Sequence, residues 1–148
     1  MVNVYDINIK KLDDRAIIPT YGSEFAAGAD LYACMDAAVT VEPGQTVMVH
    51  TGIAMEIPAG FAGLVYARSG LASKKGLAPA NKVGVVDEDY RGEVIVALYN
   101  QTDEPKTINA GDRIAQLVIE NVEFPIVREC EYLDDTERGS GGFGSTGK

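Results

Sequence analysis

Short apolar runs separated by turn residues recur along most of the chain. Residues 39–58 form two β-rich runs around a Pro-Gly turn, and residues 92–100 have the composition of a strand interior. Residues 110–122 open with a turn and continue as another apolar strand. Turns at intervals of about 8–12 residues predict an all-β protein, built as a jelly roll or a β-barrel.

Only residues 68–76 have helical features. Ser69 is predicted to be the N-cap, Lys74 and Lys75 fall in the last turn, and Gly76 suits the left-handed position that ends a helix. We expect a short buried helix whose free N-terminal amides favour an anion. A boundary is predicted near Thr136, between a folded body (1–136) and a glycine-rich arm (137–148).

Composition narrows the class of protein. A length of 148 residues with 46% apolar residues predicts one domain. The net charge of −9 argues against non-specific binding to nucleic acid or anionic membranes, so a polyphosphate ligand would need a few arginines and a divalent cation. No apolar run approaches the roughly 18 residues that span a bilayer, and no secretion signal is evident. A cytoplasmic protein is expected.

The cysteines and the histidine do not suggest a metal site. Cys34 and Cys130 fit no metal-ligand spacing and are expected to be reduced, partly buried thiols. His50 is the only histidine and is predicted to be structural or at the surface. A protein-bound zinc or a Cys-His pair is therefore not expected.

The last residues read ERGSGGFGSTGK, and five glycines there cannot hold a fixed backbone by themselves. The segment has the side chains to bind a nucleotide: Arg138 for a phosphate, Phe143 for a base, and Ser145 and Thr146 for further phosphate oxygens. A flexible tail is the simpler interpretation. Residues 142–148 also match the G-x-x-x-x-G-K signature of a phosphate loop. We reject that match because the sequence stops at Lys148, without the hydroxyl residue and helix that the motif needs.

Five segments combine glycine with charged or hydroxyl residues: AGADLYA (27–33), ARSGLA (67–72), GVVDEDYRG (84–92), GDRIAQLVI (111–119) and RGSGGFGSTG (138–147). In this order they closely resemble the five motifs of the trimeric dUTPases, the deoxyuridine triphosphate nucleotidohydrolases. The resemblance implies a distorted jelly roll and a homotrimer in which all three chains build each active site. It also implies Mg²⁺-dependent hydrolysis of dUTP to dUMP and pyrophosphate.

The third motif implies the chemistry and the choice of nucleotide. Asp87 matches the general base that activates a water for attack on the α-phosphorus, and it follows a Val-Val pair that predicts the edge of a buried strand. Glu88 and Asp89 are rival bases, and a hairpin cap is the simpler role. Tyr90 matches the ring that packs on deoxyribose and excludes ribonucleotides, although a cross-strand aromatic pair is an alternative. Asn81 matches a base contact, with hairpin backbone groups, including those of Val86, reading the uracil edge.

The remaining motifs imply contacts to phosphates and metal. Arg68, Ser69 and Gly70 match the phosphate-binding motif, in which Ala67 replaces the usual proline. The resemblance assigns Mg²⁺ to Asp30 and Gln116 through its water shell, with substrate phosphates as inner ligands. Arg113, in the fourth motif, is left open between a structural ion pair and a phosphate contact.

The arm matches the fifth motif. Arg138 resembles the arginine that engages the γ-phosphate, Phe143 the ring that stacks on uracil, and Gly144, Ser145 and Thr146 the segment that clasps the terminal phosphates. Two alternatives to dUTP hydrolysis remain open. One is a related deoxycytidine triphosphate deaminase, and the other is a regulatory trimer that binds dUTP without turnover.

Overall fold

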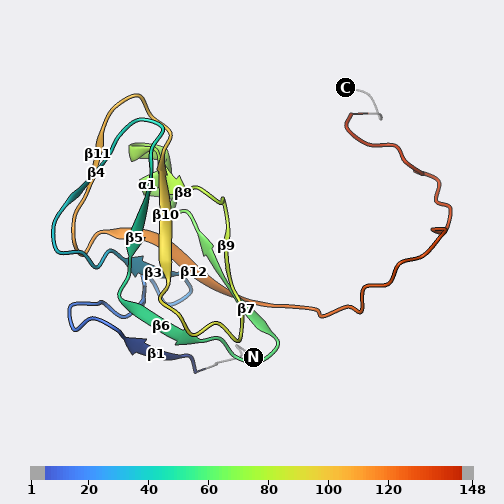
Figure 1. Cartoon of the computed structure of the whole chain (residues 1–148), viewed down its shortest axis with the longest axis horizontal. Coiled ribbons are helices and arrows are strands. Elements are labelled where there is room, and N and C mark those ends of the chain that lie inside the picture. Colours follow the sequence, from blue (N-terminus) through green and yellow to red (C-terminus); the bar gives the residue numbers. More distant parts are fainter. Residues whose placement is uncertain (1–5, 145–148) are drawn as a thin grey trace.

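The computed structural model describes residues 6–144, which form twelve strands and one helix. In chain order these are β1 (Asn8–Lys11), β2 (Thr20–Tyr21), β3 (Ala29–Tyr32), β4 (Val39–Val41), β5 (Thr46–His50), β6 (Ile53–Glu56), β7 (Phe61–Tyr66), α1 (Ser69–Lys75), β8 (Leu77–Pro79), β9 (Gly84–Val86), β10 (Ile95–Asn100), β11 (Lys106–Ile108) and β12 (Arg113–Asn121). The predicted all-β class with one short helix is confirmed (Figure 1).

Antiparallel pairing arranges the strands in four sheets. The largest has the order β2-β3-β12-β7-β9, the second has the order β5-β10-β8, and β1-β6 and β4-β11 form two-stranded pairs. Within residues 6–144 the pairing does not close these sheets into one barrel. Strand β12 lies at the centre of the largest sheet, so the motif around it is held between β3 and β7.

The core lies between the sheets. Leu31, Val41, Leu98 and Ala115 are completely buried there. Along β10 buried residues alternate with more exposed ones, as expected for a strand that has one face on the core. The buried side chain of Asn100 donates to the carbonyls of Val41 and Glu104, and its own oxygen accepts from Thr102. Its burial is therefore compensated by hydrogen bonds.

The second run within residues 39–58 is divided where a single strand was expected. Strand β5 ends at His50 and β6 begins at Ile53, because Gly52 has a φ of 67° and turns the chain. A Cβ at Gly52 would lie 3.0 Å from both Ala16 Cβ and Cys34 Sγ. The close approach of these side chains requires glycine at this turn.

The helix differs from its prediction at its first residue and in its burial. Arg68, with extended backbone, is the N-cap, and Ser69 is the first helical residue. Arg68 is held by an ion pair to Asp30, a contact that local sequence preference does not include. No residue of α1 is buried, so the expectation of a buried helix was wrong. Gly76 does end the helix in the left-handed conformation, with Lys74 and Lys75 in the last turn as predicted.

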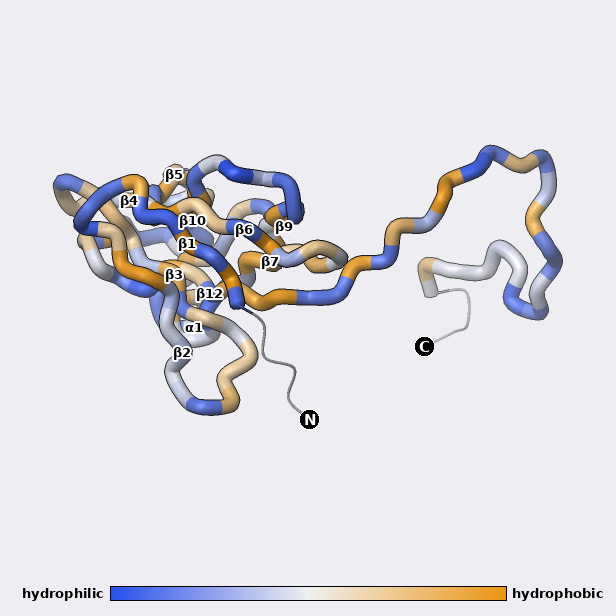
Figure 2. Tube along the Cα trace, turned by 90° about the horizontal axis from the view of Figure 1, so that it is seen from below, coloured by the Kyte–Doolittle hydropathy of each residue, from blue (hydrophilic) through white to orange (hydrophobic). Residues whose placement is uncertain are grey.

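After β12 the chain leaves the body as an extended segment. Figure 1 shows this segment standing away from the sheets, and Figure 2 shows hydrophobic and hydrophilic residues alternating along its first part. Its large apolar side chains are exposed, among them Phe124, Ile126 and Leu133. The extended segment begins well before Thr136, while the division into a body and a functional arm at 137–148 stays a prediction. No helix in the described part of the chain is long and apolar enough to cross a membrane.

Candidate functional site

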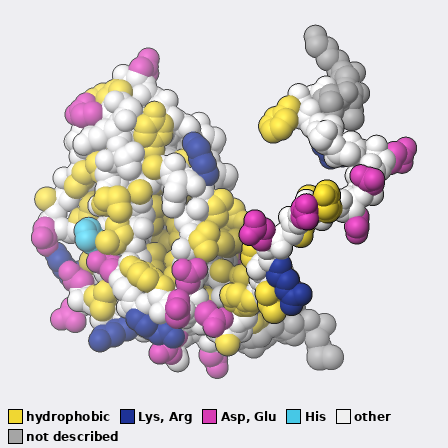
Figure 3. Space-filling model, turned by 45° about the vertical axis from the view of Figure 1, so that its right-hand side comes forward, with side chains coloured by type: hydrophobic (Ala, Val, Ile, Leu, Met, Phe, Trp, Pro, Cys, Tyr) yellow, Lys and Arg dark blue, Asp and Glu magenta, His cyan; other side chains and the backbone are white. Residues whose placement is uncertain are grey.

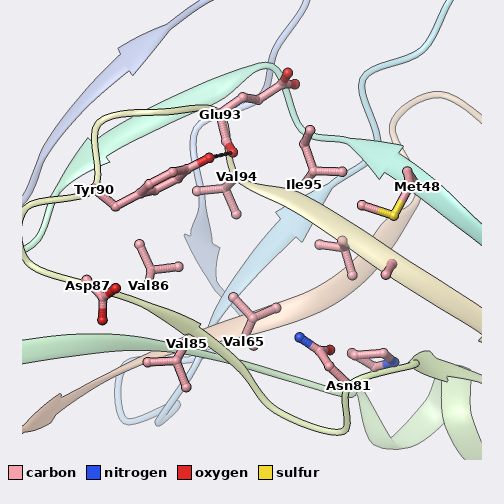
Figure 4. Close-up of a pocket in the computed structure, with 14 residues that line it drawn as sticks. Met48, Val65, Asn81, Val85, Val86, Asp87, Tyr90, Glu93, Val94 and Ile95 are labelled. Carbon is pink, nitrogen blue, oxygen red and sulfur yellow. Dashed lines mark hydrogen bonds between the residues drawn. The ribbon is translucent and has the colours of Figure 1, made fainter.

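One pocket gathers the predicted residues of the third motif. Asn81, Val86, Asp87 and Tyr90 line a cavity of about 390 Å³, within the range of ligand sites. Its other walls come mainly from β5, β7 and β10, through side chains that include Met48, Val65 and Ile95. Figure 4 shows Asp87 and Tyr90 at one end of the pocket and Asn81 at the other. The fold thus brings Asp87 and Tyr90 of the third motif together with Asn81, which precedes that motif in the sequence.

Asp87 follows β9 directly, at the point where the strand gives way to a turn. The expectation of a buried strand is only half correct, because Val86 is 8% exposed whereas Val85 is 63% exposed. Strand β9 is an edge strand that pairs only with β7 in the described part of the chain, and the exposure of Val85 shows that residues 6–144 leave one face of β9 uncovered. Among residues 6–144 the exposed Asp87 carboxylate has no hydrogen-bond or ion-pair partner, which leaves it available to accept a proton.

The two rival carboxylates are placed differently. Glu88 Oε2 accepts a hydrogen bond of 2.7 Å from the Gly60 amide, so this carboxylate ties the turn to the start of β7. Neither Glu88 nor Asp89 lines the cavity that holds Asn81 and Tyr90. Both lie with Asp87 along a neighbouring depression that includes Phe124. Position therefore favours Asp87 as the base of the three.

Tyr90 is fixed by its own loop. Its hydroxyl donates to the Glu93 carbonyl at 2.9 Å, the bond drawn in Figure 4, and its ring covers Gly92. A Cβ at Gly92 would lie 2.6 Å from the ring carbon Cζ of Tyr90. Glu93, Met48 and Ile95 are pocket residues that the sequence analysis missed. For Glu93, its position three residues after Tyr90 was the one sequence feature that could have indicated a place in the pocket.

A second cluster forms around Asp30, which is 8% exposed. Pairing in the large sheet places Gln116 of β12 beside Asp30 of β3 and Tyr66 of β7. Arg68 Nε lies 2.7 Å from Asp30 Oδ1, and Arg113 lies 3.4 Å from Oδ2. The fold therefore brings Asp30, Gln116, Arg68 and Arg113 together, and the structural ion pair considered for Arg113 is present.

The side chain of Gln116 has a fixed orientation. It donates to the Ala67 carbonyl at 2.9 Å, and its Oε1 lies over Gly28, where a Cβ would approach it to 2.6 Å. Among residues 6–144 no three His, Cys, Asp or Glu side chains are grouped to bind a metal. One carboxylate and one amide do not form an inner-sphere cage. They fit a cation held mainly by phosphate oxygens and water, as the resemblance implied.

Asp87 and Arg68 lie apart. Asp87 follows Val86, which pairs with Gly63, whereas Arg68 lies beyond Tyr66 at the other end of β7. At about 3.3 Å per residue these two residues are roughly 15–20 Å apart along the strand. Arg68 and Gly70 line a different cavity of about 380 Å³, and Ser69 is exposed beside it. One chain therefore does not bring its proposed base and its proposed phosphate site together.

The described part of the arm, residues 137–144, does not complete either site within this chain. Figure 3 shows the extended segment standing off the body. Arg138 Nε donates to the Gly141 carbonyl at 2.7 Å, and Phe143 is fully exposed with a φ of 52°. Gly144 is likewise exposed, and Ser145 and Thr146 lie outside the described residues.

The remaining candidate groups lie outside this pocket. His50 is exposed, as predicted, and its Nδ1 lies 2.9 Å from Glu93 Oε2. Cys34 is half-buried, and burial raises the pKa of its thiol. Cys130 is exposed, which corrects the expectation of partial burial, because residues 123–140 of the extended segment are all exposed in the described structure. Near Cys34, the Arg15 guanidinium holds the pKa of the Asp13 carboxyl well below its usual range.

Comparison with known proteins identifies the family. The dUTPase family model matches residues 14–147. The deoxyuridine 5'-triphosphate nucleotidohydrolase of Desulfitobacterium hafniense (strain DSM 10664 / DCB-2) is 54% identical over 131 residues, which cover 88% of this chain and 87% of the relative. The nucleotidohydrolase of the same name from Corynebacterium glutamicum is 47% identical over 149 residues, covering 100% of this chain and 99% of the relative.

Solved structures show the same fold. The dUTPase of Staphylococcus bacteriophage 80alpha with dUPNHPP has a TM-score of 0.88 at 28% identity, covering 98% of this chain and 100% of its own. A mutant dUTPase of phage phi11 of S. aureus, described with a structural Mg(II) ion, has a TM-score of 0.76 at 25% identity, covering 86% of this chain and 98% of its own. The jelly-roll prediction agrees with these neighbours. By sequence over nearly its whole length and by fold, the chain belongs to the dUTPase family.

Proposed function

We propose that this protein hydrolyses dUTP to dUMP and pyrophosphate, with Asp87 as the general base. The observation that carries the proposal is the Asp87 carboxylate, which has no partner among residues 6–144 and lies at the edge of a pocket that also holds Asn81 and Tyr90. Asp87 takes a proton from a water, whose oxygen bonds to the α-phosphorus as the bond from that phosphorus to the bridging oxygen breaks. Pyrophosphate leaves with the electron pair of that bond.

The pocket is proposed to hold the nucleoside. Asn81 and the backbone around Val86 meet the uracil edge, where cytosine would leave buried groups unpaired. Tyr90 lies beside the sugar, and its ring leaves no room for a 2′-hydroxyl. The segment around Val86 is proposed to leave no room for the methyl group of thymine.

The triphosphate is proposed to be held by other subunits of a homotrimer. Arg68, Ser69 and Gly70 bind phosphates from one neighbouring chain, because the same chain places them far from Asp87. Arg138, Phe143, Gly144, Ser145 and Thr146 arrive on an arm, with Arg138 on the γ-phosphate and Phe143 on uracil. Arg113 stays paired to Asp30 or turns to phosphate when substrate binds.

Asp30 and Gln116 are the residues that would hold Mg²⁺ through its water shell. The ion would neutralise charge on the phosphates as pyrophosphate leaves. Arg68 and Arg113 already neutralise the nearly buried Asp30, so the cluster has enough positive charge to receive an anion. The phi11 relative described with Mg(II) supports a role for the ion in this family. A cytoplasmic location is part of this proposal.

Pyrophosphate release from dUTP, measured with Mg²⁺ and with a chelator, tests the proposal. We expect release that depends on Mg²⁺ and falls strongly with UTP, dCTP or dTTP. Ammonia release from dCTP would instead support the deaminase, and dUTP binding without pyrophosphate would support the regulatory trimer. Either outcome would overturn the proposed reaction.

A further inference from the structure

We propose that Glu93 is a positioning residue that fixes the Tyr90 ring and thereby sets the discrimination between deoxyribonucleotides and ribonucleotides. The inference rests on the proposed function, in which Tyr90 lies beside the sugar. Glu93 lines the pocket of Asp87 and Tyr90 and also a neighbouring depression with His50 and Gly52, so it lies between the two.

The carboxylate of Glu93 is held at both oxygens. Oε1 accepts from the Gly52 amide at 2.8 Å, and Oε2 lies 2.9 Å from His50 Nδ1. Gly52 is buried, and this is the hydrogen bond that satisfies its amide. The side chain of Glu93 is 23% exposed and that of His50 is 55% exposed, so the contact with the Gly52 amide is better shielded from water than the contact with His50.

The backbone next to Glu93 is fixed to the same turn between β5 and β6. The buried hydroxyl of Thr51 donates to the Val94 carbonyl, and the Val94 amide donates to the Ile53 carbonyl at 2.9 Å. Side chain and backbone together therefore anchor residues 93 and 94. The Glu93 carbonyl, to which the Tyr90 hydroxyl donates, is held in place by this anchor.

The position of the Tyr90 ring depends on this carbonyl and on Gly92. The ring is 45% exposed as a residue and rests on Gly92, so few other contacts within the chain fix it. If Glu93 loses its carboxylate, the buried Gly52 amide loses its acceptor and the loop of residues 91–93 relaxes. The ring then has more than one position, and a 2′-hydroxyl can be accommodated.

The test compares Glu93→Ala with the conservative Glu93→Gln in the full-length protein. Gln keeps an oxygen for the Gly52 amide and an NH₂ group for an unprotonated His50, so it should rescue the contacts. We expect Glu93→Ala to lower the ratio of kcat/KM for dUTP to that for UTP by about tenfold or more. Glu93→Gln should keep the ratio within about twofold of the original value. Glu104→Ala is the matched control and should change nothing, because it removes an exposed carboxylate that pairs, among the described residues, only with Lys106.

A readout without substrate separates this inference from the proposed reaction. In protein with ¹³C-labelled tyrosine rings, the Tyr90 signal is assigned by its loss in Tyr90→Phe. It should shift and broaden in Glu93→Ala and stay in place in Glu93→Gln. If the wild type does not hydrolyse dUTP, the proposed function fails, and the ring signal still decides whether Glu93 positions Tyr90.

Three results would overturn the inference: an unchanged Tyr90 signal in Glu93→Ala, an unchanged dUTP to UTP ratio, or an equal loss of activity with both nucleotides. A purely structural role would give the last result, with a lowered melting temperature. If Glu93→Ala does not fold, Glu93→Asp takes its place, because the shorter side chain cannot reach both Gly52 and His50.

A double variant tests whether Glu93 acts through Tyr90. Glu93→Ala/Tyr90→Phe should have a dUTP to UTP ratio of kcat/KM no lower than that of Glu93→Ala alone, and additive losses would contradict action through Tyr90.

Discussion

At the scale of single residues, the acidic side chains near the motifs differ in their hydrogen-bond and ion-pair partners. Asp87 has no partner within residues 6–144, whereas Glu88 accepts from Gly60 and Asp30 faces two arginines. Of these three carboxylates, only that of Asp87 has both oxygens free of partners within the described residues. Three acidic groups near the motifs therefore have three distinct environments.

Asp87→Asn should lower kcat for dUTP by roughly 10²–10⁴-fold and leave nucleotide binding nearly intact. The amide keeps the size of the side chain but cannot accept the proton of the water. Steady-state kinetics and nucleotide titration measure the two effects. Asp89→Asn is the matched control from the same turn. Loss of turnover in that variant, with retention in Asp87→Asn, would reassign the base to Asp89.

Gly92→Ala should displace the Tyr90 ring without unfolding the protein. The new Cβ would lie 2.6 Å from Tyr90 Cζ, so the ring must move away. A misplacement of about 1 Å in a site can cost up to about 10²-fold, and we expect a loss of kcat/KM for dUTP of that order. Gly22→Ala, where a Cβ meets open space, serves as the control. Normal kinetics in Gly92→Ala would mean that the ring position is unimportant.

At the scale of elements, short strands and turns decide where the motifs lie. Strand β12 pairs with β3 and β7 at once, so Gln116 lies beside Asp30 and near Arg68 although the three are far apart in sequence. Strand β9 is short and at the edge, which leaves Asp87 accessible. The extended segment after Asn121 contributes no strand to the body within the described part of the chain.

Deleting residues 137–148 should leave the body folded and abolish most activity. The hydrogen bonds of this segment in the described structure are local, such as that from Arg138 to Gly141, so the body loses no packing. Arginines that engage transferring phosphates contribute roughly 10³–10⁵-fold in rate in other phosphoryl-transfer enzymes. Arg138→Ala should show part of the loss, and Phe143→Ala a smaller one near the stacking value of roughly 1–3 kcal/mol. Circular dichroism and kinetics rank the variants. A folded truncation with normal activity would make the arm a simple tail.

At the scale of the whole molecule, the two candidate sites point to assembly. Asp87 and Arg68 lie near opposite ends of β7, and the arm extends away from both (Figure 1). Exposed apolar side chains such as Val85, Phe124 and Ile126 remain without cover in one chain. A symmetric trimer would cover such surfaces and bring different segments together at each site.

Sedimentation should give three times the mass of the chain, and mixing two inactive variants should restore activity. In trimers formed from equal amounts of Asp87→Asn and the 137–148 deletion, a shared site takes its base from one chain and its arm from another. At a given site the base is intact with a chance of about one half, and so is the arm, so about a quarter of the sites should be active. Each variant alone, refolded in the same way, is the control. An inactive mixture, or an active monomer, would contradict shared sites.

Part of this architecture was determined locally and could be predicted from the sequence. The turn and strand within residues 110–122, the helix end at Gly76 and the five motifs depend on neighbouring residues, through turn preference, apolar runs and the special backbone of glycine. Family resemblance gave Asp87, Tyr90 and Asn81 as one group, and their common pocket follows from their closeness in sequence, within residues 81–90.

Only the tertiary structure decided the rest, because the deciding contacts join distant residues. Asp30 fixes Arg68, which makes Arg68 rather than Ser69 the N-cap of α1. Close packing against Ala16 and Cys34 turns the chain at Gly52. The sequence gives no sign that Glu93 differs from an ordinary exposed charge. Its contacts to Gly52 and His50 join residues about 40 positions apart and form only when the chain has folded. Sequence patterns indicate local backbone preference, whereas contacts between distant residues depend on how the folded chain packs.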